Sequence, residues 1–131
     1  MKNASASLKR ILVVEDEPAI CDLCRRVLTD EGFEVDIAVN GKVAQDMIEE
    51  QQYDLCLLDI RLPAMNGKEL YQWLQEKHLA LAGRVVFTTG SVIGEDTMTC
   101  LEQTGRPFLL KPFTPDELKA IVRETLKEVE K

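Results

Sequence analysis

Four short runs of apolar residues lie along the chain, and no polar residue interrupts any of them. They are residues 11–14, 55–58, 85–87 and 108–110. Such runs are typical of strands that helices cover on both faces, as in a parallel sheet. Residues 33–39 instead alternate between apolar and other residues. That alternation is typical of a strand with one less buried face, so we expect it at an edge of the sheet.

The segments between these strands have the three- and four-residue spacing of apolar positions that is typical of helices facing a core. Pro18 suits the first position of the first helix. A second helix is expected after the Asn-Gly turn at 40–41, a third over about 68–78, and a fourth, with few apolar anchors, within 91–104. The last helix is expected after the sequence TPDE at 114–117, which offers an N-cap, a first-turn proline and a capping-box glutamate.

Five strands, each followed by a helix, predict an α/β domain of the doubly wound class. Right-handed crossovers leave few topologies, and the flavodoxin-like (βα)5 fold fits best, with a five-stranded parallel sheet in the order 2-1-3-4-5. This order places the alternating strand at an edge. It also predicts a ligand site beyond the carboxyl ends of strands 1 and 3, where the strand order reverses.

Size and charge narrow the possible functions. The chain has 131 residues, which fits one domain, with 16 Lys and Arg against 23 Asp and Glu. A net charge of -7 argues against direct binding to nucleic acid, because such binding needs an excess of basic residues. With no apolar stretch of membrane-spanning length and no signal-peptide core, we expect no membrane insertion and a cytoplasmic protein. The domain is expected over residues 8–131. The polar residues 1–7 are expected to be either a disordered N-terminal end or residues added by cloning.

Four cysteines raise the question of a redox or zinc site, because Cys21 and Cys24 form a C-x-x-C pair. A zinc site would need a second pair of ligands, and the sequence has one histidine, His78. The cysteines also lie within apolar patterns rather than in the turn-rich spacing of a small secreted domain. We therefore expect reduced thiols that pack in the structure.

Polar side chains follow four of the predicted strands at their carboxyl ends. They are Glu15 and Asp16, Asp59, Thr88 and Thr89, and Lys111. Each alone could be a helix cap or a solvated strand end, but together they converge on one crevice. Three carboxylates held together favour either a raised pKa or a bound divalent cation, and Mg²⁺ is the natural candidate. Asp59 would then be a nucleophile for a phosphoryl group, with Lys111 and a threonine hydroxyl on other phosphoryl oxygens.

Three segments make this chemistry more specific. Residues 11–18 (ILVVEDEP), 54–67 (DLCLLDIRLPAMNG) and 111–113 (KPF), together with Thr89, resemble the receiver domain of two-component response regulators. The resemblance covers nearly the whole chain. Residues 105–108 (GRPF) and the KPF segment also resemble receivers attached to hybrid sensor histidine kinases.

The resemblance implies roles for individual residues. Asp59 would be the phosphoacceptor, while Asp16, Asp59 and the main-chain carbonyl of Arg61 bind Mg²⁺ and Glu15 acts on the metal through water. The family's switch hydroxyl, switch aromatic and phosphate-binding lysine match Thr89, Phe108 and Lys111. The peptide before Pro112 is expected to be cis, as is typical of the family.

The resemblance also implies a signalling role rather than an enzyme that turns over a separate substrate. Asp59 would take a phosphoryl group from a histidine kinase or a histidine phosphotransfer protein, and the domain would assist its own phosphorylation and dephosphorylation. Phosphorylation would switch a protein-protein interaction face made of the fourth helix, the fifth strand and the last helix. The partner would be a downstream protein or an attached domain, and a homodimer is a further possibility.

Three other functions are weaker. A phosphatase of the haloacid dehalogenase type also uses an aspartate nucleophile, but it needs a second aspartate two residues further on, where this chain has Arg61. A flavodoxin-like electron carrier would use residues 88–91 as a phosphate cradle, yet these follow the wrong strand. A receiver-like module that binds partners without phosphorylation would not need the acceptor, acidic pair, threonine and lysine that are all present here.

Overall fold

The computed structural model describes residues 9–62, 65–90 and 95–130, and these contain one parallel sheet. Its five strands follow the order β2-β1-β3-β4-β5, as predicted, with every neighbouring pair parallel. The strands are β1 (Arg10–Val14), β2 (Glu34–Ala38), β3 (Leu55–Asp59), β4 (Val85–Thr89) and β5 (Phe108–Leu110). The end expected to be disordered, 1–7, lies outside the described residues, and so do residues 91–94 at the start of the segment in which the fourth helix was predicted.

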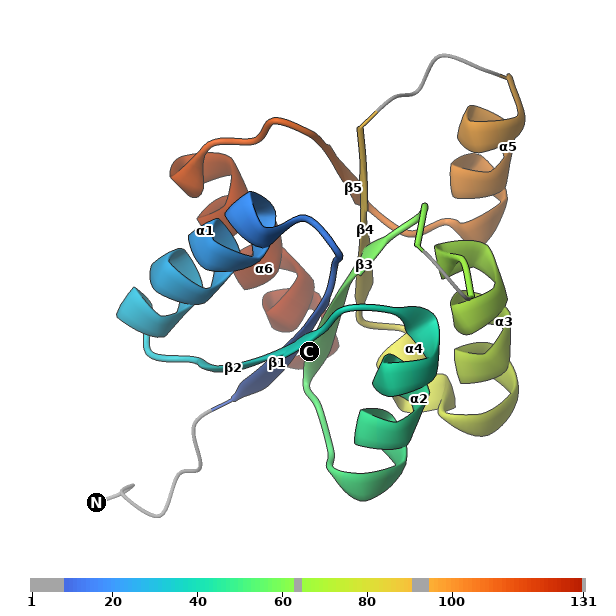
Figure 1. The fold of residues 1–131 in the computed structure, drawn as a ribbon, viewed down its shortest axis with the longest axis horizontal. Helices are drawn as coiled ribbons and strands as arrows, with labels where there is room; N and C mark the ends of the chain where they lie inside the picture. Colours follow the sequence, from blue (N-terminus) through green and yellow to red (C-terminus); the bar gives the residue numbers. More distant parts are fainter. Residues whose placement is uncertain (1–8, 63–64, 91–94, 131) are drawn as a thin grey trace.

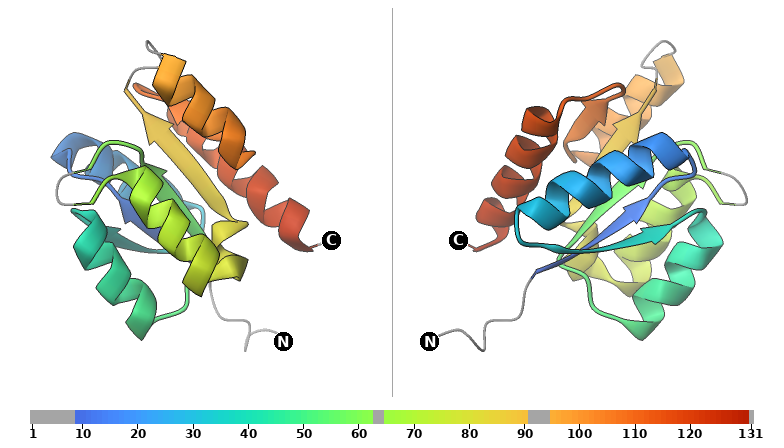
Figure 2. Two further views of the ribbon diagram at one scale, coloured as in Figure 1. Left: turned by 90° about the vertical axis from the view of Figure 1, so that its right-hand side faces the viewer. Right: turned by 60° about the vertical axis from the view of Figure 1, so that its left-hand side comes forward.

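Helices cover both faces of the sheet (Figures 1 and 2). They are α1 (Pro18–Asp30), α2 (Gly41–Glu50), α3 (Gly67–Lys77), α4 (Leu79–Ala82), α5 (Glu95–Thr104) and α6 (Pro115–Glu130). In Figure 1, α1 and α6 lie on one side of the sheet, and α2, α3 and α5 lie on the other. The five expected helices are therefore present, and the single turn α4 was not predicted.

The core consists of two apolar layers, one on each face of the sheet. Successive strand residues point to opposite faces, so Ile11 and Val13 of β1 pack in the layer beneath α1 and α6, while Leu12 and Val14 pack in the layer beneath α2 and α3. All four are at most 2% exposed. The continuous apolar runs of β1, β3 and β4 are thus explained by burial on both sides, whereas the run at 108–110 forms the second edge strand, β5, where Leu110 is 43% exposed. β2 forms an edge and is only partly buried, as its alternating pattern predicted.

Local capping determines where the helices near the carboxyl edge begin. The Asn66 side chain accepts a hydrogen bond from the Glu69 N–H at 2.9 Å, and the Glu69 carboxylate accepts one from the Asn66 N–H, which makes a capping box at the start of α3. The predicted capping box before α6 is confirmed. There the Thr114 hydroxyl accepts from the Glu117 N–H at 3.1 Å, and the Glu117 carboxylate accepts from the Thr114 N–H at 2.8 Å.

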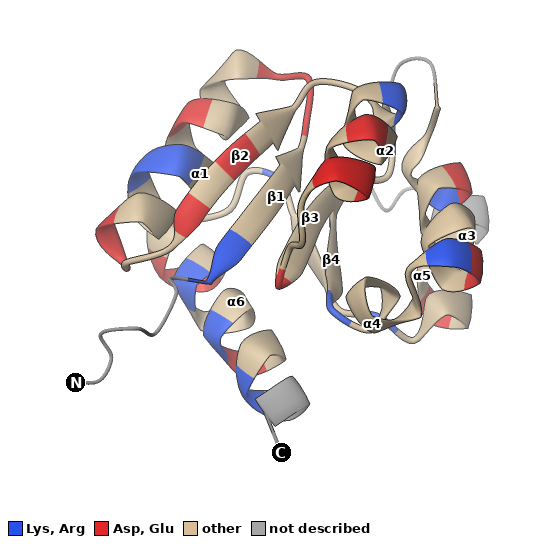
Figure 3. Cartoon of the chain, turned by 90° about the horizontal axis from the view of Figure 1, so that it is seen from below, with Lys and Arg blue, Asp and Glu red and all other residues tan. Residues whose placement is uncertain are grey.

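Charged residues tie the edge strand β2 to its neighbour. Arg10 at the start of β1 lies 3.3 Å from carboxylate oxygens of both Glu34 and Asp36 on β2. In Figure 3 the blue of basic residues on β1 lies next to the red of acidic residues on β2. Tyr53 donates a hydrogen bond to Asp36 at 2.8 Å.

Among the described residues, none of the helices is both long and apolar enough to cross a membrane.

Candidate functional site

The carboxyl ends of the central strands bring the predicted polar residues together. Asp59 is the last residue of β3 and lies in register with Thr88 of β4. The Lys111 N–H donates to the Thr89 carbonyl at 2.8 Å, which fixes the start of the segment after β5. Glu15 follows β1 directly, and its N–H donates to the Ala38 carbonyl at 2.9 Å. Parallel strands place all these ends at one edge of the sheet.

Lys111 lies at the centre of the site. Its Nζ is 2.8 Å from Glu15 Oε1, 3.0 Å from Glu17 Oε1 and 3.0 Å from Asp59 Oδ2. Burial alone would lower the Lys111 pKa, but the contacts with these three carboxylates outweigh it and hold the pKa above its ordinary value. One ammonium group therefore faces three carboxylates, and the site remains acidic.

Glu15 is buried to an unusual degree for a carboxylate, at 1% exposure. One of its oxygens, Oε2, accepts hydrogen bonds from the N–H groups of Asp16 and Glu17 at 3.2 and 3.1 Å, at the start of α1. The other, Oε1, faces Lys111 without the geometry of a hydrogen bond. Burial raises the Glu15 pKa. The nearby Lys111 ammonium opposes this rise, and the nearby Asp59 charge adds to it.

The donor set fits a hard divalent cation. Carboxylate oxygens of Glu15, Glu17 and Asp59 all lie within 4.8 Å of one another, and Asp59 is 4% exposed. Oxygen atoms of this kind are the ligands that Mg²⁺ prefers. The Glu15 Oε1 atom already faces one cationic group, the Lys111 ammonium, at 2.8 Å.

Two details of this cluster differ from the residues chosen on sequence. Asp16 is exposed and does not belong to the group of close carboxylates, whereas Glu17 does. Pro18 is the feature of the sequence that could have indicated the position of Glu17, because a residue before proline is held in an extended conformation. Glu17 is the N-cap of α1 and is extended, with φ -85° and ψ 116°. The backbone of Arg61 lies against the acceptor, since its N–H donates to Asp59 Oδ1 at 3.0 Å, while its side chain is exposed.

The remaining predicted residues lie on and after strands β4 and β5. Thr89 is 1% exposed at the end of β4. Phe108 opens β5, lies in register with Phe87 of β4 and is partly buried against the core. The peptide between Lys111 and Pro112 is cis, which confirms the prediction.

Comparison with known proteins assigns this arrangement to a family. The model of the response regulator receiver domain matches residues 11–123. The chain belongs to this family. It is 36% identical to the DNA-binding response regulator MtrA of Mycolicibacterium smegmatis over 93% of this chain and 52% of that protein. It is 35% identical to the transcriptional regulatory protein DltR of Streptococcus agalactiae over 87% of this chain and 50% of that protein.

Solved structures agree with this assignment. A CheY-like receiver domain protein from Methanospirillum hungatei superposes with a TM-score of 0.86 at 33% identity, covering 95% of this chain and 98% of that one. The receiver domain of a sensor histidine kinase from Pseudomonas aeruginosa superposes with a TM-score of 0.81 at 28% identity, covering 92% of this chain and 99% of that one. That structure carries a magnesium ion in its active-site cleft. The present chain spans about half the length of the curated relatives.

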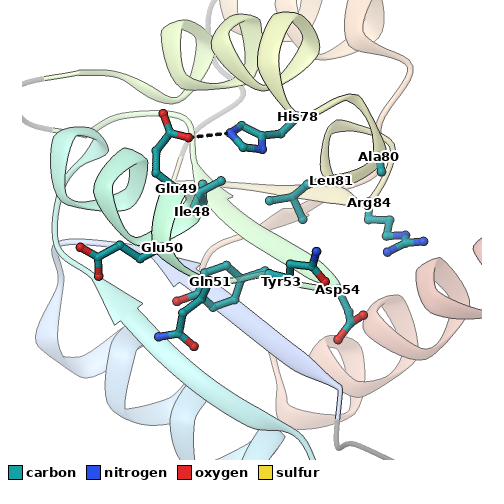
Figure 4. Close-up of a pocket in the computed structure, with 11 residues that line it drawn as sticks. Ile48, Glu49, Glu50, Gln51, Tyr53, Asp54, His78, Ala80, Leu81 and Arg84 are labelled. Carbon is teal, nitrogen blue, oxygen red and sulfur yellow. Dashed lines mark ion pairs between the residues drawn. The ribbon is translucent and has the colours of Figure 1, made fainter.

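A separate cavity lies at the opposite end of the receiver domain's sheet (Figure 4). It has a volume of about 480 Å³ and is lined by residues that precede β3 and β4, among them Asp54 and Arg84. Within it His78 Nε2 lies 3.3 Å from Glu49 Oε2, and the His78 ring packs on Trp73 with centroids 4.9 Å apart. Because β3 runs the length of the sheet from Leu55 to Asp59, this cavity is remote from the acidic cluster.

The cysteines of the receiver domain form no disulfide among the described side chains. Cys21, Cys24 and Cys56 are free thiols, which confirms the prediction for these three. Burial raises the pKa of the Cys24 and Cys56 thiols to about 12. Cys21 is half-buried, and its Sγ donates to the Glu15 carbonyl at 3.4 Å. The side chain of Cys100 lies outside the described part of the chain.

Proposed function

We propose that this receiver domain accepts a phosphoryl group on Asp59 from a histidine kinase or a histidine phosphotransfer protein. The observation that supports Asp59 most strongly is its position beside Lys111, with Oδ2 3.0 Å from Nζ, at the end of the central strand β3. An ammonium group at this distance can bind phosphoryl oxygens once they arrive. Membership of the receiver family favours this role over that of a phosphatase.

The transfer is a substitution at phosphorus. A carboxylate oxygen of Asp59 attacks the phosphorus of a phosphohistidine, so that a P–O bond forms while the P–N bond breaks. The imidazole leaves with the bonding electron pair and takes up a proton from solvent. Lys111 and the hydroxyl of Thr89 are proposed to bind the phosphoryl oxygens as charge develops on them. In this way the domain assists its own phosphorylation and the later hydrolysis of the aspartyl phosphate.

The acidic cluster is proposed to hold Mg²⁺ for this reaction. When bound, Mg²⁺ supplies positive charge that offsets the carboxylates and the charge on the phosphoryl oxygens. The residues proposed to hold it are Asp59, Asp16 and the main-chain carbonyl of Arg61, with Glu15 acting through water. The close approach of the Glu15 and Asp59 carboxylates supports the part of these two residues, while Asp16 and Arg61 are assigned by their positions in the motif of the receiver family.

The output is proposed to be a change of surface at α5, β5 and α6. Movement of Thr89 toward the phosphoryl group would leave space for the ring of Phe108, which is partly buried on β5 next to β4. Phe108 has no hydroxyl, so burial of the ring would drive its inward movement. A partner protein or an attached domain would then recognise the altered shape.

The identity of that partner is part of the proposal. Relatives of about twice this length include a protein described as a DNA-binding response regulator, so an attached domain with such an output is compatible with the family. The chain carries a net charge of -7, which disfavours direct contact with nucleic acid. A cytoplasmic location and homodimer formation belong to the same proposal.

The test is phosphorylation by a small phosphodonor. Incubation with acetyl phosphate and Mg²⁺ should add one phosphoryl group, which intact-mass spectrometry detects as a single mass increment. Asp59→Asn should abolish the increment, whereas Asp46→Asn, a change of the same charge at an exposed position on α2, should retain it. Labelling of the Asp59→Asn protein at the wild-type rate, or labelling that a chelator leaves unchanged, would show the proposal to be wrong.

A further inference from the structure

Glu17 holds the ammonium group that the proposed reaction needs. Its Oε1 lies 3.0 Å from Lys111 Nζ, although its side chain is 59% exposed. Position 17 is the N-cap of α1, yet the Glu17 side chain makes no capping hydrogen bond. The N–H groups of Asp16 and Glu17, the two residues before the helix, donate instead to Glu15 Oε2. The Glu17 carboxylate is therefore directed to Lys111 rather than to its own helix.

The contact places Glu17 in competition with a phosphoryl group. Lys111 already has Glu15 and Asp59 as partners, and both are buried. Glu17 is the exposed member of the three, at 59% exposure of its side chain. An incoming phosphodonor also arrives from solvent and needs the same ammonium group.

We propose that Glu17 is a positioning residue that restrains Lys111 in the unphosphorylated protein and must release it when Asp59 is phosphorylated. This inference rests on the proposed function. Glu17 thereby slows phosphorylation, and it shortens the lifetime of the phosphorylated form because it competes for Lys111 afterwards. An exposed ion pair contributes up to about 1 kcal/mol, which corresponds to about a two- to fivefold change in rate.

Two substitutions separate this role from a general effect of charge. Glu17→Gln removes both the charge and the ion pair. Glu17→Asp keeps the charge but shortens the side chain, and an aspartate at an N-cap bonds to the N–H groups of its own helix. If Glu17 acts by holding Lys111, both variants should be phosphorylated about two- to fivefold faster than wild type. If its charge merely repelled the anionic donor, Glu17→Asp would behave as wild type and the inference would be overturned.

The rates are measured with acetyl phosphate and Mg²⁺ by intact-mass spectrometry, beside two further proteins. Asp30→Asn is the matched control, because Asp30 is the exposed last residue of the same helix, roughly 20 Å away at 1.5 Å per residue. It should keep the wild-type rate. In a Lys111→Ala background Glu17→Gln should no longer accelerate the reaction, because the group that it restrains is gone. An undiminished acceleration there would overturn the inference.

Failure of this inference is distinguishable from failure of the proposed function. If wild type is labelled at Asp59 and Glu17→Gln is labelled equally fast, the restraint on Lys111 is refuted while the phosphoacceptor role stands. A slower rate in Glu17→Gln with a weaker dependence on Mg²⁺ would assign Glu17 to the metal and would also refute it. If wild type is not labelled at all, the proposed function itself fails.

Discussion

Gly67 is the point where α3 approaches the strand that carries the proposed phosphoacceptor. It is the first residue of α3, and its N–H donates to the Ile60 carbonyl at 3.1 Å. A Cβ added here would lie 2.5 Å from the backbone oxygen of Asp59 and 2.7 Å from the Ile60 Cα. Both are backbone atoms at the end of β3, so no side chain can rotate away to make room. We therefore predict that Gly67→Ala forces the helix and the strand end apart.

The cost follows from the size of the overlap. Carbon-oxygen contacts are usually above roughly 3.2 Å, so the added methyl group would have to move by most of an ångström. Overpacking of this kind costs about 1–3 kcal/mol, and the better helix propensity of alanine returns less than about 1 kcal/mol. We expect a net loss of about 2 kcal/mol in the free energy of unfolding. For a chain of this length that lowers Tm by roughly 6–10 °C.

Gly83→Ala is the matched control. A Cβ at Gly83 would meet only the carbonyl oxygens of Ala80 and Leu79, at 3.6 and 3.9 Å, and the backbone there has φ -73°, which alanine adopts readily. Because alanine restricts the unfolded chain more than glycine does, this variant should be unchanged or more stable by up to about 1 kcal/mol.

The assay is urea unfolding followed by circular dichroism in the presence of a chelator, together with the rate of phosphorylation by acetyl phosphate. Gly67→Ala should lose stability and also react more slowly, because the displaced backbone belongs to Asp59. The reasoning is refuted if the free energy of unfolding of Gly67→Ala lies within about 0.5 kcal/mol of that of wild type. It is also refuted if Gly83→Ala is destabilised as much as Gly67→Ala.

Three further results are expected. Burial raises the Glu15 pKa, so the native protein holds this proton more tightly than the unfolded chain does, and the ionised carboxylate lowers stability at neutral pH. Glu15→Gln should therefore raise the free energy of unfolding by about 1 kcal/mol when a chelator is present. A lower free energy of unfolding would contradict this. Mg²⁺ should raise the Tm of wild type, and Glu15→Gln should reduce that increase; an equal increase in both proteins would argue against a role for Glu15 at the metal. Cys24 and Cys56, with thiol pKa values of about 12, should be labelled by iodoacetamide at pH 8 far more slowly in the native than in the unfolded protein, and peptide mapping that found equal rates would show that they are not buried.

The strand order and the general place of the site could be derived from the sequence because both depend on local pattern. The apolar runs of β1, β3 and β4 identify the three central strands, and the alternating run identifies the edge strand β2. The apolar run of β5 does not reveal that β5 is the other edge. Once the strands are parallel, their carboxyl ends lie at one edge of the sheet, which places Asp59 and Lys111 at the same edge. The 3.0 Å between them depends on how the segment after β5 packs. The capping box before α6 is equally local, since it needs only Thr114 and Glu117 three residues apart.

Other features depend on how separate elements approach one another. Asp16 and Glu17 are neighbouring acidic residues in the sequence, and only the course of the chain into α1 decides that Glu17 reaches Lys111 while Asp16 remains exposed. Nothing in the pattern around Gly67 indicates that its Cα lies against the backbone of Asp59, because that contact depends on how far α3 packs from β3. Sequence periodicity determines which face of an element is buried, but distances between side chains of different elements are set only when those elements pack in three dimensions.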